Sequence, residues 1–191
     1  MDVKQAILER RSIRKYTDQP ISDADINDIL EAGLYAPSAI DLQHWYYVVV
    51  KSPEKMEELK QFMSDVYDKF EPVLLDRFKN NPATIAETKA FLKGLGGAKF
   101  VILAFLYKDD YPDVKGAMEG VCAGIQNMLL TAHSKGIGSC WMTAPMRVGM
   151  DGQLKEKYAA GHGEFVAAIT FGYPAQSPKA PRRKEDRFII I

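Results

Sequence analysis

Four cations and a hydroxyl stand within six residues near the N-terminus: Arg10, Arg11, Ser12, Arg14 and Lys15. If this stretch is extended, alternate side chains share a face, so Arg10, Ser12 and Arg14 point the same way. Two guanidinium groups and a hydroxyl on one face form a donor set suited to a phosphate dianion. The alternative is a solvated basic turn that interacts favourably with the dipole of a preceding helix.

A second basic cluster lies in the tail, at Arg182, Arg183 and Lys184. By itself it is typical of a solvated charge run, but two clusters in a neutral chain suggest a shared anionic ligand. Three charge-assisted hydrogen bonds contribute at most about 5–9 kcal/mol, whereas micromolar affinity needs about 8 kcal/mol before the costs of ordering. A ligand held through its phosphate must therefore also bury a flat, apolar body.

A loop between a predicted helix and a predicted strand combines small and polar residues: Pro37, Ser38, Ala39, Asp41 and Gln43. Small side chains allow a ligand to come close to the backbone, and the polar ones can contact the edge of a heteroaromatic ring. The alternative is an ordinary helix-to-strand loop.

A glycine-rich turn near residue 137 offers a fourth set of contacts. Backbone amides at Ile137, Gly138 and Ser139 can donate hydrogen bonds to a ligand. The alternative is that Gly136 ends a helix and a core strand follows.

Reactive side chains are scarce. His44, His133 and His162 share no metal-ligand spacing with each other or with the two cysteines, so no metal site is predicted. Cys140 has no histidine or cationic neighbour in sequence, and no Gly-x-Ser-x-Gly motif is present. Many ligand-holding groups and few reactive ones indicate an enzyme whose cofactor performs the chemistry.

The elements that must position these residues follow from periodicity and capping signals. Ser22, and Ser52 followed by Pro53, mark helix starts, and Gly136 marks a helix end. The pattern predicts helices over 2–10, 22–36, from 53, 117–135 and 152–158, and strands over 45–50, 100–107, 139–143 and 164–171. No strand leads into a glycine fingerprint for dinucleotides, which favours an α+β layer fold over a doubly wound one.

The whole chain of 191 residues is expected to form one domain. Residues 70–97, broken by prolines and glycines, are expected to be a variable helical excursion. The formal net charge is zero, which argues against a broad nucleic-acid or membrane surface, and no apolar run is long enough to span a bilayer. A cytoplasmic protein without structural disulfides is expected. The apolar residues at the chain end, 188–191, are expected to be buried against another surface.

Together these segments resemble the nitroreductase family of flavin enzymes. The resemblance covers nearly the whole chain and rests on four motifs in order: residues 9–16, 36–45, 136–141, and 171–174 with 181–183. It implies a sandwich with a central, mostly antiparallel sheet flanked by helices, assembled as an intertwined homodimer. Two FMN molecules would lie at the dimer interface, and the tail, 174–191, would reach the partner subunit.

The resemblance also implies a role for each motif. Arg10 and Ser12 would bind the FMN phosphate with help from the tail residues Arg182 and Lys184 or Arg183. Arg14 would lie near the pyrimidine edge of the flavin. The other subunit would supply Pro37, Ser38, Ala39 and Gln43, and the backbone of Ile137, Gly138 and Ser139 would line the ring or the ribityl chain. Arg11 and Asp41 are also expected among the cofactor-binding residues.

The activity implied is that of an oxidoreductase. Hydride would pass from NADH or NADPH to flavin N5 and then to a flat acceptor, such as a nitroaromatic or a quinone. Asp41 stands where the family usually has Asn, and His44 where it usually has Pro, changes that alter the charge and polarity beside the flavin. The alternatives are a non-catalytic FMN-binding protein and a flavin-fragmenting or dehalogenating relative.

Overall fold

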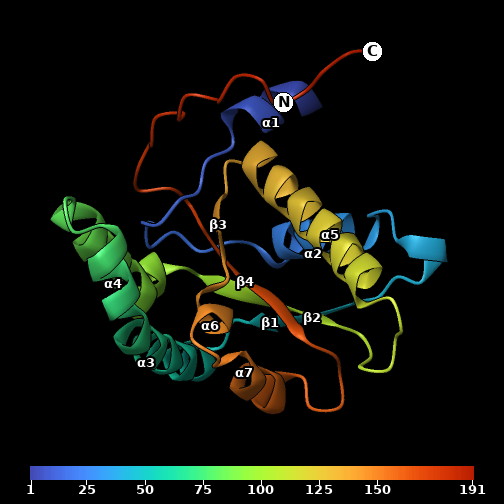
Figure 1. Ribbon diagram of the computed structural model, residues 1–191, viewed down its shortest axis with the longest axis horizontal. Helices are drawn as coiled ribbons and strands as arrows, with labels where there is room; N and C mark the ends of the chain where they lie inside the picture. The colour runs from blue at the N-terminus through green and yellow to red at the C-terminus, as the bar shows by residue number, and fades with distance from the viewer.

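A four-stranded sheet forms the centre of the protein in the computed structural model, which describes all residues from Met1 to Ile191 (Figure 1). Its strands are β1 (Trp45–Val50), β2 (Phe100–Leu106), β3 (Gly138–Met142) and β4 (Phe165–Gly172). They lie in the order β1-β2-β4-β3, and each neighbouring pair is antiparallel. The expected α+β architecture, with an antiparallel sheet flanked by helices, is confirmed.

Helices cover both faces of this sheet (Figure 1). One layer contains α1 (Val3–Glu9), α2 (Asp23–Leu34) and α5 (Val114–Ser134); the other contains α3 (Pro53–Arg77), α4 (Pro82–Gly94), α6 (Ala144–Arg147) and α7 (Asp151–Tyr158). Alternate residues of β2 serve the two layers, because Phe100 and Ile102 pack with α5 while Val101 and Leu103 pack with α3. The sheet is therefore buried on both sides.

The predicted helix boundaries at Ser22, Ser52 and Gly136 are confirmed. Ser22 and Ser52 each accept a hydrogen bond from the backbone amide three residues later. Gly136 adopts a φ of +74° and closes α5, with its own amide donating to the carbonyl of His133 and the next amide donating to that of Ala132. This Schellman arrangement fixes how the chain leaves α5 for β3.

Three elements differ from expectation. The helix α3 continues through Pro72, because Tyr67 and Leu74 are buried on either side and their packing outweighs one lost backbone hydrogen bond. The helix α5 begins one turn early, capped by Asp113, and the short helix α6 was not predicted. Residues 70–97 are helical as expected, and they contribute buried apolar side chains from α4 to the core.

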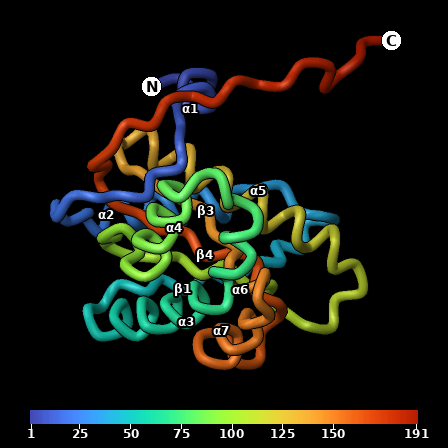
Figure 2. The backbone as a smooth tube through the Cα atoms, turned by 60° about the vertical axis from the view of Figure 1, so that its left-hand side comes forward, coloured from blue at the N-terminus to red at the C-terminus, as the bar shows by residue number.

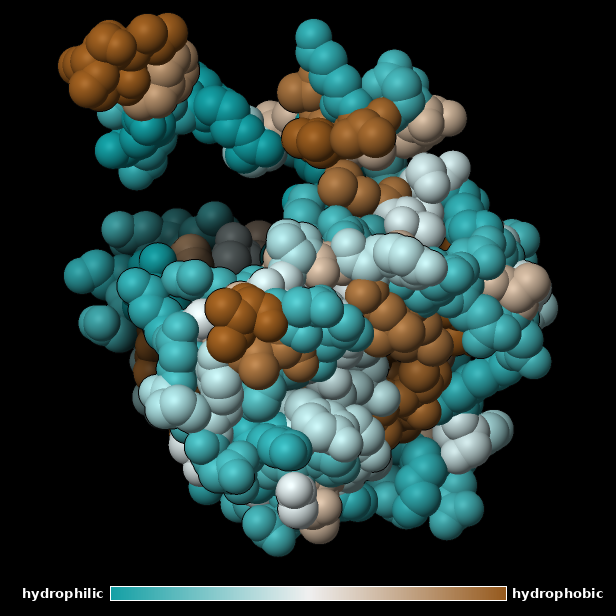
Figure 3. All heavy atoms as spheres, turned by 90° about the vertical axis from the view of Figure 1, so that its right-hand side faces the viewer, coloured by the Kyte–Doolittle hydropathy of each residue, from teal (hydrophilic) through white to brown (hydrophobic).

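The tail beyond Pro174 runs past α1 and leaves the body of the chain (Figure 2). Its last four residues are apolar and are each more than four-fifths exposed, standing clear of the rest of the surface (Figure 3). None of the helices has the length and apolar character needed to cross a membrane.

Candidate functional site

Residues 10–17, which we call the strap, connect α1 to the edge of the sheet. Ser12 forms a parallel bridge with Ser139, and the amide of Ile13 donates to the carbonyl of Ser139 at 2.9 Å. The hydroxyl of Tyr16 donates to the carbonyl of Ile13 at 2.6 Å and lies 2.8 Å from Thr170 Oγ1. The basic residues near the N-terminus are thus held against β3 and β4 and are not part of a free turn.

A pocket of about 700 Å³ lies between the strap, the C-terminal end of α5, the start of β3 and the first residues of the tail. We call it the strap pocket. Five of the predicted site residues line it, namely Arg10, Arg11, Ile137, Gly138 and Ser139. Two motifs that are far apart in sequence therefore meet at one cavity.

The strap pocket has an excess of positive charge. Arg10 is half-buried and forms no salt bridge, and the Arg11 guanidinium donates only to the carbonyls of Leu8 and Arg10, at 2.7 and 2.6 Å. Burial, and then the charges of Arg11 and Arg183, lower the pKa of Arg10, against a smaller opposing effect of Cys140. A bound anion would relieve this repulsion.

Arg10, Ser12 and Arg14 all lie near the buried thiol of Cys140. Burial raises the pKa of Cys140, while the charges of Arg14 and Arg10 and a hydrogen bond with Ser12 oppose that shift. That Arg10, Ser12 and Arg14 share one face of the strap stays a prediction. The Arg14 guanidinium also lies 5.9 Å from the ring centroid of Phe91 on α4. Since the thiol stays protonated at neutral pH, it is a poor nucleophile.

Two polar atoms beside the strap pocket are buried without a hydrogen-bond partner. They are Ser139 Oγ, in a residue only 1% exposed, and His133 Nε2. A buried polar atom that lacks a partner costs free energy, so such atoms commonly mark where a ligand or an ordered water binds.

The loop residues predicted to contact a ligand form a compact turn away from the strap pocket. Its 3₁₀ helix η1 (Ala39–Asp41) is flanked by polar contacts: the Gln43 amide donates to Ser38 Oγ, and the Gln43 side chain donates to Asp41 Oδ1, each at 3.0 Å. Ile40, Asp41 and Gln43 all have positive φ. Such strained backbone is often retained at functional sites. Asp41 thus engages the side chain that was expected to contact the flavin.

This loop does not reach the strap pocket of its own chain. Ser38 and Pro37 pack beside Gly120 near the start of α5, whereas His133 lines the strap pocket at the other end. Thirteen residues of helix separate Gly120 from His133, a distance of about 20 Å. The predicted site residues therefore fall into two separate groups.

The three predicted tail residues differ in their surroundings. Arg183 is close enough to influence Arg10, while Arg182 forms an ion pair with Glu185 at 2.6 Å. Lys184 is exposed and lies in a shallow hollow with its tail neighbours.

Comparison with known proteins places these features in a family. A family model described as the nitroreductase family matches residues 7–173, a span that includes the strap, the loop and the whole sheet. The chain belongs to the nitroreductase family. Residues 1–6 and the tail, 174–191, lie beyond the matched span.

Individual nitroreductase-family relatives agree. A protein of Methanothermobacter thermautotrophicus, named as a candidate NADH dehydrogenase/NAD(P)H nitroreductase, is 30% identical over 181 residues, covering 93% of this chain and 80% of that protein. A crystal structure of a candidate nitroreductase in complex with FMN from Desulfovibrio desulfuricans is 29% identical, with a TM-score of 0.70 over 97% of this chain and 93% of that one. A nitroreductase with bound FMN from Bacteroides fragilis shares the fold, with 24% identity and a TM-score of 0.75 over 100% and 99% of the chains.

Sequence reasoning did not single out two residues beside the predicted ones. His133 was considered as a metal ligand, and Phe91 lay in the stretch 70–97, for which no site residue was predicted. The position of His133 in the last turn of α5, three residues before Gly136, carried no signal, because only tertiary packing brings it to the strap.

Proposed function

We propose that the chain is an FMN-dependent oxidoreductase that uses NADH or NADPH to reduce a flat acceptor such as a nitroaromatic or a quinone. The observation that carries this proposal is the strap pocket, where unpaired guanidinium groups meet the buried, unpartnered hydroxyl of Ser139. Family membership and relatives named as nitroreductases with FMN support it. Bound FMN would supply hydride exchange in two half-reactions, the first with the nicotinamide and the second with the acceptor.

The residues present fit a phosphorylated flavin. Arg10 and Arg11 offer charge-assisted hydrogen bonds to the phosphate, and the hydroxyl of Ser139 adds a neutral donor. Ser12 does not line the pocket, but it pairs with Ser139 beside it. Arg183 of the tail adds positive charge to the same pocket. The excess of cations, which is unfavourable in the empty chain, is thereby neutralised when the phosphate binds.

The protein's contribution to the reaction is orientation and electrostatics. Arg14, placed over Phe91, presents a fixed cation toward the expected pyrimidine edge of the flavin. Fixed positive charge at that edge favours the added negative charge of a reduced ring. No protein nucleophile is required, and the protonated Cys140 provides none.

The second half of the site would come from a partner subunit. Because the loop 37–43 lies about 20 Å along α5 from the strap pocket, one flavin cannot contact both groups within a single chain. A two-fold homodimer would bring the loop of each chain to the strap pocket of the other. The exposed apolar end of the tail, 188–191, supports the same assembly.

The test is flavin retention by a double variant, Arg10→Ala with Arg14→Ala. The purified wild-type protein should show flavin absorbance between about 300 and 550 nm that bleaches with NADH or NADPH in the absence of oxygen. The double variant should lose the flavin, whereas Lys15→Ala, an exposed cation of the same strap, should keep it. Unchanged flavin content in the double variant would refute the assignment.

A non-catalytic FMN-binding protein is the second candidate, favoured by the hydrogen bond that holds Gln43 to Asp41. Consumption of NADH or NADPH in the presence of a quinone distinguishes the two, because a binding protein retains flavin but does not turn over.

A further inference from the structure

His133 faces the strap pocket from the last turn of α5. Its Nε2 atom is buried and has no hydrogen-bond partner, and the side chain lines the same cavity as Arg10 and Ser139. The charged groups that face it from other elements are Glu9 at the end of α1, the strap residues Arg10 and Arg11, and the N-terminus at the pocket's edge.

The surroundings keep the free imidazole neutral. Burial is the main cause that lowers the pKa of His133, and the charges of Arg10 and Arg11 lower it further, while Glu9 opposes them. The C-terminal end of α5 has the opposite influence, since a helix C-terminus favours a cation. An anion bound in the pocket would be a second and stronger influence that favours the protonated form of the imidazole.

One rigid turn sets the positions of His133 and Ser139. The turn at Gly136 is fixed by two backbone hydrogen bonds, and the strap pairs with Ser139 directly after it. Both unpartnered atoms are thus supplied by the joint between α5 and β3, on the wall that faces the strap arginines. A ligand with several acceptor oxygens can satisfy both atoms and the guanidinium groups together.

We propose that His133 is a further ligand of the FMN phosphate beside the Ser139 hydroxyl already assigned to it, and that His133 takes up a proton from solvent when the phosphate binds. This inference rests on the proposed function. The inference goes beyond that function by linking FMN affinity to pH through the side chain of His133.

The direction of this link follows from the charges. A phosphate dianion beside the imidazole favours the protonated form, so the pKa of His133 is higher in the complex than in the free chain. Between these two values, FMN binding takes up a proton and affinity rises as pH falls. Below about pH 6 the phosphate itself gains a proton, which weakens the attraction. The informative interval is therefore roughly pH 6.5 to 8.5.

The experiment titrates the flavin-free, full-length protein with FMN at pH 6.5 and 8.5 and follows flavin fluorescence. Wild-type affinity should be roughly tenfold higher at pH 6.5, the difference expected between a charged and a neutral hydrogen bond to phosphate. His133→Gln should remove most of that difference while still binding FMN. Riboflavin, which lacks the phosphate, should show no such pH dependence with either protein.

Calorimetry in two buffers of different ionisation enthalpy gives a second readout that a purely structural role would not change. FMN binding at pH 7.5 should take up a fraction of a proton in the wild-type protein and none in His133→Gln. His162→Gln is the matched control, because His162 stacks on Tyr46 away from the strap pocket and should leave proton uptake unchanged.

Ser139→Ala should weaken FMN binding several-fold at both pH values without changing the pH dependence, since the hydroxyl does not titrate. If His133→Gln keeps the wild-type pH dependence and proton uptake, the inference is overturned and the proposed function stands. If the wild-type protein binds no FMN at either pH, the proposed function itself fails.

Discussion

At the scale of single residues, Arg10 combines a cost to the folded chain with a benefit to ligand binding. Its half-buried guanidinium has no carboxylate partner and lies beside Arg11. Arg10→Ala is expected to weaken FMN binding by about 1.5–3 kcal/mol, or about 10- to 100-fold. The same change should leave the flavin-free protein as stable as the wild type or slightly more stable, because repulsion is removed.

Thermal unfolding of the flavin-free variant and an FMN titration measure the two effects separately. Arg10→Lys is the informative companion, since it keeps the charge but loses the two-pronged donor geometry, and its affinity should fall between those of wild type and Arg10→Ala. A variant that loses stability along with affinity would show that Arg10 serves packing and not the phosphate.

At the scale of elements, the strap depends on Tyr16. Burial raises the pKa of Tyr16, so its hydroxyl remains a protonated donor to the carbonyl of Ile13 and a partner of Thr170. Tyr16→Phe leaves these buried groups unsatisfied and should lower the free energy of unfolding by about 1–3 kcal/mol. Denaturant unfolding checks this value, with Tyr35→Phe as the control because Tyr35 is 80% exposed and has no hydrogen bond. Equal stability of the two variants would contradict the role assigned to Tyr16.

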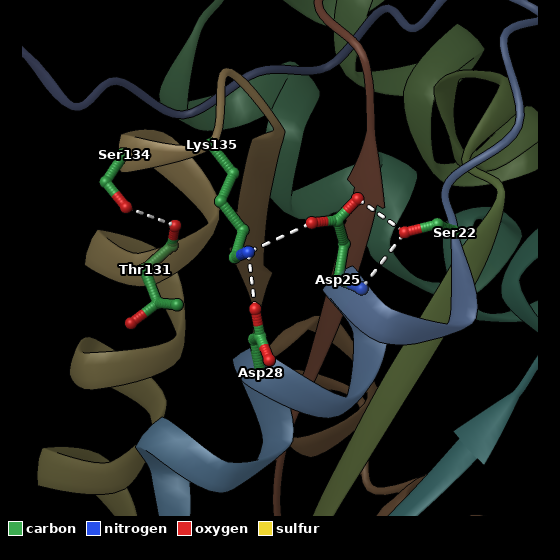
Figure 4. Close-up of polar contacts among 6 residues, drawn as sticks. All are labelled: Ser22, Asp25, Asp28, Thr131, Ser134 and Lys135. Atoms are coloured by element: carbon green, nitrogen blue, oxygen red, sulfur yellow. Dashed lines mark hydrogen bonds and ion pairs between the residues drawn. The ribbon is translucent and has the colours of Figure 1, made fainter.

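The junction of α2 and α5 predicts how stability depends on acid. Asp25 accepts hydrogen bonds from the Ser22 hydroxyl and from Lys135, and Lys135 also binds Asp28 (Figure 4). The hydrogen bond from Ser22, and then that from Lys135, lower the pKa of Asp25. Because its pKa is lower in the folded state, the ionised carboxylate stabilises the fold above the unfolded value near 3.9, and this is lost as pH falls through the folded value.

Asp25→Asn should therefore be less stable than wild type from about pH 5 to 7, and the difference should close below about pH 4. Urea unfolding at several pH values measures this gap. Ser22→Ala removes the largest cause of the shift and should show part of the same effect. A gap that stays constant down to pH 3 would mean that the carboxylate charge is not responsible.

The elements themselves were largely predictable because their signals are local. The run of aromatic and β-branched residues from Trp45 to Val50 gave β1 its observed bounds. Pro72 was misleading, since a proline reads locally as a break, whereas burial of Tyr67 and Leu74 decides the outcome.

Parts of the candidate site that depend on the two-residue repeat of an extended backbone were predictable from the sequence. Parts that depend on tertiary packing were not. The convergence of Arg10, Ser12 and Arg14 follows from the two-residue repeat of an extended chain. The presence of His133 in the strap pocket depends on how α1 docks against α5, and no local pattern records that contact.

At the scale of the whole molecule, the apolar chain end predicts how the protomers are held together. Phe188, Ile189, Ile190 and Ile191 are each more than 80% exposed. Replacing all four by serine should weaken a homodimer by at least about 3 kcal/mol, or more than 100-fold, since each buried apolar side chain contributes about 1.5–3 kcal/mol. Sedimentation velocity over a concentration series measures the change. Asp186→Ser, in the same tail, should leave the dimer intact, and a monomeric wild type would exclude this role of the tail.

The separation of the two residue groups along α5 predicts that two defective chains can restore one site. The double variant Arg10→Ala with Arg14→Ala lacks two of the four strap cations. Ala39→Trp places a bulky ring in the loop where a small residue is expected to face the partner's flavin. Each variant alone should retain little FMN.

Co-expression of the two variants in equal amounts should recover flavin in about a quarter of the sites. Mixed dimers form about half of the population by random pairing, and each has one site with an intact strap and an intact loop. If the strap and the loop served a flavin within one chain, mixing the two variants would recover none. Flavin content of the separated mixed dimer, measured by absorbance, decides between these arrangements.

The control combines all three changes in one chain, which is co-expressed with the wild type. Its mixed dimer pairs an intact strap with a damaged loop at one site and a damaged strap with an intact loop at the other, so neither site is whole and little FMN should remain. If strap and loop acted within one chain, the wild-type chain of that dimer would keep its own flavin, and half of the sites would stay filled. The two mixtures therefore give opposite results for the two arrangements.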